Sequence, residues 1–442
     1  MKKLLPLILL LALLLSACSN AAGTVSESSP EDKSAAAADS DRTDHTLITL
    51  DGSEVRIVGG GAREQGGAVV ISAAGTYEIT GVSSEKVLVV DTGDDPMDVT
   101  LILNNVQITS LTEPAVHVKQ AKHFRLRLAK DSENLLCSGS EDALQSPDPN
   151  ASGAALYCED DMDIEGEGRL TVLGCLNNGI ACKKDLDINS GSIKVVAANN
   201  GVKGNNSVQI KGGELEVSSM GDGVKSTRLD KEGKGYVELS GGQVSVESWG
   251  DGIQAATELR LTGGSLSVTT RGDGIEQSSK ALKARDHVLI SDGSFLLNTR
   301  EVGVRCSEGN VDISGGTLDI LALGEGVLTG EKDSNLGDIS VSGGTLTISA
   351  GKQALKARGV FTVSGGSILA LSGSEKQAAP SGQPSLLCQI TGPEGDSLQI
   401  GSLAGISSRQ SYKSLLFVSP ELSSGQEISV SYRLGSVDVT VR

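Results

Sequence analysis

Aromatic residues are scarce in this chain of 442 residues, which contains one Trp, five Tyr and four Phe. Histidine is equally rare, and its four residues form no HExxH or catalytic-triad pattern. No P-loop or dinucleotide-binding fingerprint occurs, because the glycine pairs follow strand-like segments and open no helix. These absences argue against the common nucleotide-binding and zinc-hydrolase classes.

Basic charge is also in short supply. Lys and Arg number 38 against 56 Asp and Glu, so the formal net charge is −18. A protein that binds nucleic acid needs a basic face to neutralise phosphates. We therefore expect no nucleic-acid partner.

Only one long hydrophobic run is present, Leu4 to Leu15, and it is too short for a comfortable transmembrane helix. Two lysines precede it, and the sequence Leu-Ser-Ala-Cys that ends at Cys18 resembles a bacterial lipobox. We expect a signal peptide over 1–17 and a lipid on Cys18. The alternative is an ordinary secretory signal followed by a chance cysteine.

Residues 18–44 contain much Ser, Ala, Asp and Glu and almost no bulky apolar side chain, so they predict a flexible tether that begins at the lipidated Cys18. The expected location is extracytoplasmic, lipid-anchored to the bacterial cell membrane. The lipid would then be the only membrane contact.

Glycine is abundant, with 56 residues, and it follows a repeat. An acidic residue or Asn, then Gly, then an aliphatic anchor recurs at Asn178-Gly179-Ile180, Asn200-Gly201-Val202, Asp222-Gly223-Val224, Asp251-Gly252-Ile253 and Asp273-Gly274-Ile275. Weaker copies end at Val304, Val327 and Leu355, and an earlier copy ends at Leu156. Between the copies lie glycine pairs such as Gly212-Gly213 and Gly241-Gly242.

The spacing between these landmarks is regular. Each aliphatic anchor follows the second glycine-pair position by 11 residues, and most repeats are 22 or 23 residues long. Three repeats are longer, and we place their extra residues after the anchor, within 225–236, 276–287 and 328–338.

Short runs that alternate apolar and polar residues surround each glycine pair, as in Val208 to Val217, and such runs predict short strands. Strands at a fixed period of about 22 residues predict a solenoid whose coils stack about 4.8 Å apart. We therefore predict an all-β fold, a right-handed parallel β-helix over 45–372 with N- and C-terminal caps. A C-terminal β capping segment would span 373–442.

In such a stack, a repeated position becomes a line of side chains. The position two before the anchor places Asp222, Asp251 and Asp273 on consecutive coils. Closely spaced carboxylates repel one another unless a cation lies among them, and hard oxygen ligands suit Ca²⁺. The alternative is a row of solvated turn residues, since Asp commonly precedes Gly in turns.

The position four before the anchor brings together Trp249, Arg271 and Arg300. A ring face beside guanidinium groups would suit an acidic sugar, and Lys225 begins a basic insert nearby. The alternative is a surface column of chance composition.

The repeated GDG turns, with Ile71 to Tyr77 and Val99 to Val106, resemble the secreted bacterial carbohydrate-binding domain-containing proteins of the calcium-binding β-helix type found in clostridia. The resemblance implies a right-handed β-helix that binds plant-type polysaccharide such as cellulose or acidic pectin. It also implies a Ca²⁺ role for Asp222, Asp251 and Asp273. The scarcity of aromatic rings argues against a flat platform for crystalline cellulose.

Together these observations predict a monomeric surface protein that binds acidic polysaccharide with the help of Ca²⁺ and without catalysis. A polysaccharide lyase is the first alternative, with Arg271 or Arg300 abstracting a proton, although no general base stands out. A structural stalk or adhesin is the second. The sequence assigns no catalytic residue and leaves the question of an enzyme open.

Overall fold

A computed structural model describes residues 45–140, 153–274, 277–333 and 335–442. The predicted signal peptide, the lipid on Cys18 and the tether lie outside these described residues. None of the described segments forms a helix that could cross a membrane.

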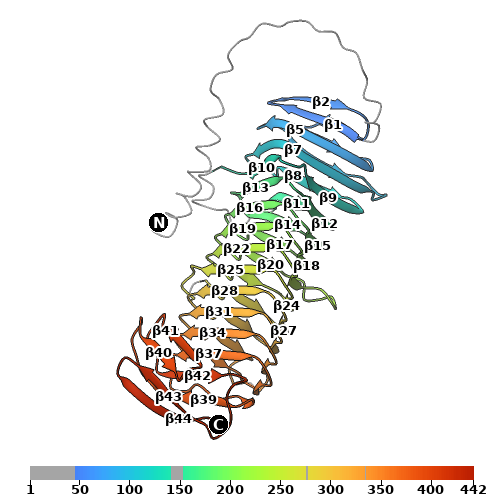
Figure 1. Ribbon diagram of the computed structural model, residues 1–442. Helices are drawn as coiled ribbons and strands as arrows, with labels where there is room; N and C mark the ends of the chain where they lie inside the picture. Colours follow the sequence, from blue (N-terminus) through green and yellow to red (C-terminus); the bar gives the residue numbers. More distant parts are fainter. Residues whose placement is uncertain (1–44, 141–152, 275–276, 334) are drawn as a thin grey trace, which may run out of the picture.

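The described chain is all-β, and it winds into a long stack of coils with parallel strands on three faces (Figure 1). Strands of six residues each form the face that we call the long-strand face: β10 (Glu133–Ser138), β13 (Arg169–Gly174), β16 (Ser192–Ala197), β19 (Glu214–Ser219), β22 (Gln243–Ser248), β25 (Ser265–Thr270), β28 (Ser294–Thr299), β31 (Thr317–Ala322), β34 (Thr345–Ala350) and β37 (Ser367–Ser372).

The chain next enters the short-strand face, a sheet of 13 strands. It consists of β3 (Ala62–Gln65), β4 (Ala68–Ile71), β6 (Val87–Asp91), β8 (Val116–Gln120), β11 (Ala154–Cys158), β14 (Asn178–Cys182), β17 (Val202–Gly204), β20 (Val224–Ser226), β23 (Ile253–Gln254), β26 (Leu282–Ala284), β29 (Val304–Cys306), β32 (Val327–Thr329) and β35 (Leu355–Lys356).

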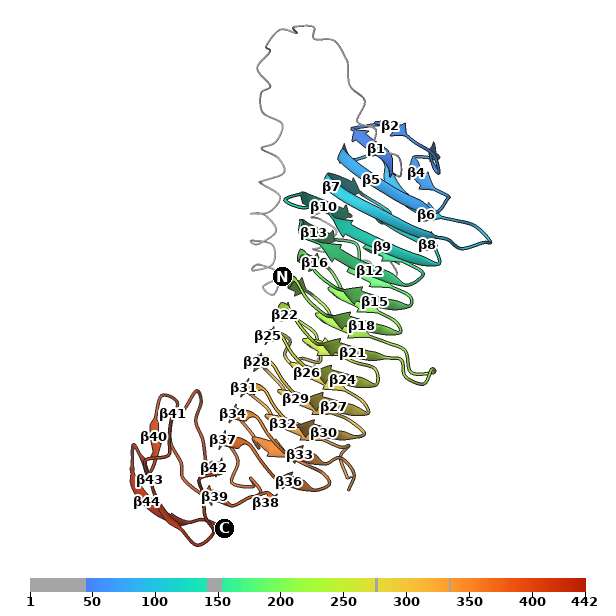
Figure 2. The ribbon, with the colours of Figure 1, turned by 45° about the vertical axis from the view of Figure 1, so that its right-hand side comes forward.

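Each coil is completed on the third face (Figure 2). This face contains β9 (His123–Leu128), β12 (Met162–Gly166), β15 (Asp185–Ile188), β18 (Ser207–Ile210), β21 (Tyr236–Leu239), β24 (Glu258–Leu261), β27 (His287–Ile290), β30 (Asn310–Ile313), β33 (Ile339–Val341), β36 (Phe361–Val363) and β38 (Ser381–Gly382). At the N-terminal end, β7 (Asp98–Ser110) pairs with both β9 and β10, and so joins the third face to the long-strand face.

Neighbouring coils pair in parallel and in register. Val224 lies opposite Val202 of the preceding coil and Ile253 of the next coil. Every second residue of β22 is buried, and two of them, Val244 and Val246, join one continuous apolar cluster along the stack. The chain thus has the stacked short strands that the repeat predicts, consistent with a β-helix solenoid.

The two glycine landmarks have different physical causes. A Cβ on Gly223 would lie 2.2 Å from Cγ1 of Val246, so the position before the anchor needs a very small residue. Gly242 instead has a φ of +80°, a conformation that side chains disfavour. Both requirements repeat with the coil, and they account for much of the glycine.

The predicted alignment is wrong at one coil. Leu282, and not Ile275, stacks between Ile253 and Val304. The second insert therefore lies before the anchor, over 271–279, while the other two lie after it, between β20 and β21 and between β32 and β33. Gly274-Ile275 and Ala281-Leu282 both offer a small residue before an aliphatic one, so the motif alone could not separate them.

Both ends of the stack contain antiparallel strands. At the N-terminal end β1 (His45–Asp51) pairs with β2 (Glu54–Val58) and, in parallel, with β5 (Gly75–Ser83), which continues the stack. At the other end β42 (Ser414–Val418) runs antiparallel to β37 and to β39 (Ser385–Cys388). A separate sheet of β41 (Ala404–Ser407), β40 (Ser397–Ile400), β43 (Glu427–Tyr432) and β44 (Gly435–Thr440) packs on its own apolar cluster beside the last coils (Figure 2).

A glutamine side chain completes the edge of the short-strand face. The Gln377 amide accepts a hydrogen bond from the Leu355 backbone N–H at 3.2 Å and donates one to the Leu355 carbonyl at 3.0 Å. The amide thus replaces a further strand beside β35. An unpaired edge would invite another chain to pair with it.

The six cysteines in the described part of the chain are buried. Cys158 lies opposite Cys182, and the Cys182 thiol donates a hydrogen bond to the Asp160 carbonyl at 2.8 Å. The hydrogen bond with Cys158 and burial both raise the pKa of Cys182, so its thiol stays neutral. Cys306 is buried at the equivalent position of a later coil, and these residues fill the interior as small apolar groups.

The corrected register can be tested by truncating Leu282, which is fully buried. We expect Leu282→Ala to lower the free energy of unfolding by about 2–5 kcal/mol, because it leaves a cavity between two coils. Leu296 is 49% exposed on β28, so Leu296→Ala is the control and should change stability little. Urea unfolding followed by circular dichroism measures both, and an unchanged Leu282→Ala variant would contradict the register.

Candidate functional site

Each coil passes from the long-strand face to the short-strand face through a turn that carries the predicted site residues. In successive coils these turns span 220–223, 249–252, 271–281, 300–303 and 323–326. We call this edge of the stack the site corner. The strands hold its backbone in place, so the side chains of equivalent turn positions form columns.

Trp249, Arg271 and Arg300 directly follow β22, β25 and β28, and so they open three successive turns of the site corner. Arg271 takes this place although its anchor is Leu282, eleven residues later, and not Ile275, four residues later. Thr270 and Thr299, the residues before the two arginines, are neighbours, since the Thr270 hydroxyl donates to the Thr299 hydroxyl at 2.9 Å. The Trp249 ring is half-buried, whereas both arginines are exposed. An indole and two guanidinium groups therefore stand on consecutive coils.

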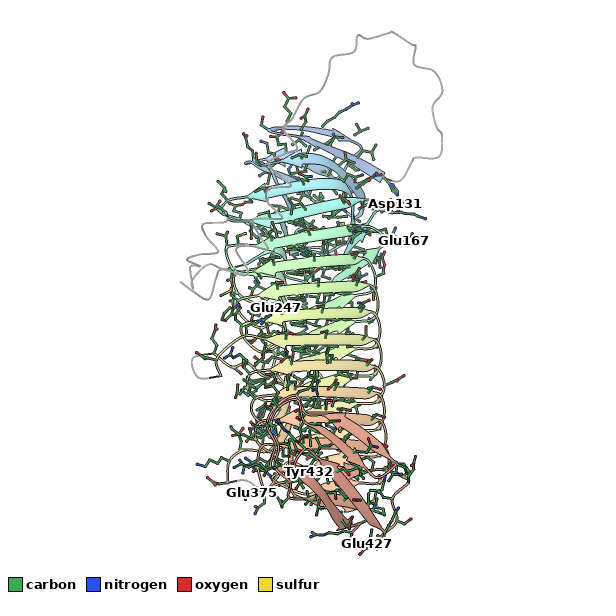
Figure 3. The ribbon with its side chains drawn as sticks, turned by 60° about the vertical axis from the view of Figure 1, so that its left-hand side comes forward. Asp131, Glu167, Glu247, Glu375, Glu427 and Tyr432 are labelled. Carbon is green, nitrogen blue, oxygen red and sulfur yellow. The ribbon has the colours of Figure 1, made fainter. Side chains whose placement is uncertain are left out.

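Two of the predicted sugar-binding cations are paired with carboxylates. The Arg271 guanidinium donates from Nε to Glu247 at 2.9 Å, and the Lys225 ammonium lies 2.7 Å from Asp222. Glu247 lies at the edge of the stack on the left-hand side of Figure 3. Lys225 belongs to β20, and its ion pair brings it to the site corner. Arg300 has no ion-pair partner among the described residues.

The acidic column forms a ladder of hydrogen bonds between side chains and the backbone. Oδ1 of Asn200 accepts from the Asp222 N–H at 3.2 Å, Oδ1 of Asp222 accepts from the Asp251 N–H at 2.8 Å, and Oδ1 of Asp251 accepts from the Lys280 N–H at 2.9 Å. Asn178 begins the same pattern one coil earlier. Asn and Asp are interchangeable in this role, because each has a side-chain oxygen that can accept.

The prediction that Asp273 joins this column is wrong. Lys280 follows Asp251 in the ladder, and its ammonium lies 2.8 Å from Glu301. Asp273 lies in the 271–281 turn instead, where its Oδ1 accepts from the Gln277 N–H at 3.4 Å. The cause is the shifted register, because Leu282 is the anchor and Lys280 stands two residues before it.

Described residues at the end of the 271–281 segment also cover Asp251. The Ser278 hydroxyl donates to Oδ1 of Asp251, and the Lys283 ammonium lies 2.9 Å from Oδ2. Gln277 reaches the Met220 carbonyl, two coils away, at 3.4 Å. The Asp251 side chain is consequently fully buried.

These residues do not fit the predicted Ca²⁺ site. Each carboxylate oxygen of Asp222 and Asp251 already has a hydrogen-bond or ammonium partner. Ca²⁺ takes six to eight oxygen ligands, and the described residues contain no cluster of three or more potential ligands from His, Cys, Asp and Glu. Lysine ammonium groups supply the balancing charge instead.

Sequence reasoning missed a basic column on the short-strand face. One residue after the anchor, Lys203, Lys225, Gln254, Lys283 and Arg305 lie on consecutive coils. Burial and the nearby Lys225 ammonium lower the pKa of Lys203. The signal was present in the sequence one position after the anchors, but the assumed register placed Glu276 there in place of Lys283.

The family model of carbohydrate-binding domain-containing proteins matches residues 65–326 and 303–415. The chain belongs to this family. The matched residues include the whole site corner and most of the coil stack.

Two further proteins match shorter parts of this chain than the family model does. A carbohydrate-binding domain-containing protein of Acetivibrio thermocellus is 33% identical over 129 residues, which are 29% of this chain and 45% of that protein. The chain therefore spans less than half of that relative's length. The solved structure of a polysaccharide lyase-like protein from C. thermocellum, a gadolinium derivative, is 30% identical with a TM-score of 0.48. That match covers 52% of this chain and 92% of the solved one.

The ladder predicts how this family member tolerates changes at Asp222. Asp222→Ala leaves the buried Asp251 N–H without an acceptor and should lower the free energy of unfolding by about 1–3 kcal/mol. Asp222→Asn keeps the acceptor and should retain most of the stability. Thermal unfolding with and without Ca²⁺ measures both variants, and equal losses for Ala and Asn would contradict the ladder.

Proposed function

We propose that the site corner binds acidic polysaccharide at the bacterial cell surface without cleaving it. The family supports carbohydrate binding, and the single observation that carries the acidic preference is the column of Trp249, Arg271 and Arg300. The half-buried indole offers a fixed apolar face for a sugar ring. The two guanidinium groups offer planar donors that match a carboxylate.

The column suits a polymer that runs along the stack axis. Its three side chains repeat with the coil, about 4.8 Å apart, so one chain of sugars could contact them in succession. Arg300 can pair with a uronate, because it has no ion-pair partner among the described residues. Arg271 would have to release Glu247 or bind Glu247 and the uronate together. Cellulose, the other substrate implied by the resemblance, has no carboxylate for these arginines.

The structure supports direct ion pairing more than bridging by Ca²⁺. Lys225 and Lys283 already occupy the oxygens that the ion would need. Calcium dependence stays a prediction from the family resemblance, and Asp222 and Asp251 would have to exchange their lysines to satisfy it. We therefore expect the guanidinium contacts to survive chelation.

The remaining expectations complete the proposal. Right-handed winding, a monomeric state, a lipid on Cys18 and an extracytoplasmic location stay predictions. A surface-anchored protein would present the stack to glycans outside the cell, because the tether predicted over 18–44 separates it from the membrane.

The proposal is tested by titrating polygalacturonate and a neutral polysaccharide into the protein, each with Ca²⁺ and again with chelator. We expect the protein to bind polygalacturonate and not the neutral polysaccharide. The affinity for polygalacturonate should be the same with Ca²⁺ and with chelator. Arg300→Ala should weaken it about tenfold, because a charge-assisted hydrogen bond is lost, and Trp249→Ala should weaken it by a similar factor.

The matched control is Arg56→Ala, which removes an exposed arginine from β2 at the N-terminal end of the stack. It should leave the affinity unchanged. Equal effects of the Arg56 and Arg300 variants, or no retention of any acidic glycan, would refute the proposal. Absorbance of an unsaturated product in the same samples would identify the lyase alternative.

A further inference from the structure

A pocket lies at the C-terminal end of the site corner. Its volume is about 450 Å³, a size typical of small-ligand sites. The last coils contribute one wall and the segment after β37 contributes the other. The charged residues that line it are Glu325, Lys352, Lys356, Glu375, Lys376 and Lys413.

The backbone of both walls is fixed by hydrogen bonds. The Gln353 side chain donates to the Lys376 carbonyl at 2.7 Å, and the Lys413 N–H donates to the Ser372 carbonyl at 2.7 Å. The Ser414 hydroxyl donates to the Ser374 carbonyl at 2.8 Å. The lysines therefore extend from a rigid frame, although they come from distant parts of the sequence.

Glu325 lines the pocket and stands two residues before the anchor Val327, as Asp222 does before Val224. Its side chain is 9% exposed, and the ammonium groups of Lys356 and Lys352 lie 3.2 and 3.4 Å from its oxygens. Burial alone would raise the pKa of Glu325, but the two lysines lower it below its usual value. The Glu325 carboxylate is therefore charged and already paired with two ammonium groups.

The lining of the pocket carries an excess of positive charge. Four lysines and two glutamates line the pocket, so its formal charge is 4 − 2 = +2. No ion pair joins Lys376 or Lys413 to a carboxylate among the described residues. On a chain with a net charge of −18, a concave group of cations concentrates anions locally.

We propose that this pocket binds the carboxylate-bearing end of an acidic oligosaccharide through Lys376 and Lys413. Two ammonium groups that have no carboxylate partner among the described residues match two carboxylates. Glu375 lies on the same side of the stack as Glu247 in Figure 3, so one glycan could reach both sites. Only the identity of the anion as a uronate rests on the proposed function.

The test is calorimetric titration of the full chain with digalacturonate, neutral galactobiose and inorganic sulfate. We expect saturable binding of digalacturonate and none of galactobiose. The double variant Lys376→Gln/Lys413→Gln should weaken binding at least about tenfold, because it removes both charge-assisted contacts. Lys119→Gln, an exposed lysine on β8, is the matched control.

Four outcomes separate the possibilities. Loss of digalacturonate binding in the double variant but not in Arg300→Ala supports the pocket as its own site. Loss only in Arg300→Ala overturns the pocket while leaving the proposed function intact. Equal affinity for sulfate overturns the sugar part of the proposal, and unchanged binding in the double variant, with a folded circular dichroism spectrum, overturns the pocket altogether.

Discussion

Backbone pairing between neighbouring coils is the constraint on which the rest of this structure depends. A strand of three residues such as β20 cannot satisfy its own N–H and C=O groups, so it needs β17 on one side and β23 on the other. Because the pairing is parallel and in register, every side chain has an equivalent directly above and below it. The interior, the glycine turns and the surface columns are all consequences of this spacing of about 4.8 Å.

The same spacing brings equivalent charged side chains of neighbouring coils close together. Two like charges at this separation repel by about 3 kcal/mol if the effective dielectric constant is about 20. The protein meets the problem by pairing the anions with nearby lysines, as in Lys225 with Asp222, Lys283 with Asp251, and Lys352 and Lys356 with Glu325. The acidic column thereby becomes part of the framework, and the cations that keep no partner become candidates for ligand binding.

This division explains why the proposed binding residues belong to the edge of the stack. The interior requires small and aliphatic side chains in every coil, and the flat faces are crossed by ion pairs between neighbouring strands, such as Lys194 with Glu216. The side chains of turn residues are less constrained, because only the strand residues on either side of a turn must keep the backbone pairing. Trp249, Arg300, Lys376 and Lys413 all stand in turns or connections, where a side chain can change without disturbing the pairing.

The sequence by itself determined the class of fold, the coil period and the stacking of Trp249, Arg271 and Arg300, because a strict repeat of small and aliphatic residues allows few other ways to bury them. Only the tertiary structure decided which of two equivalent small–aliphatic pairs enters the stack. Choosing Leu282 moves Asp273 out of the acidic column and puts Lys280 in its place. It also decided which charges neutralise one another and that residues near 325, 376 and 413 share a pocket. The physical reason is that a repeat encodes contacts between neighbouring coils, whereas ion pairs and the approach of the C-terminal segment depend on distances that no local pattern contains.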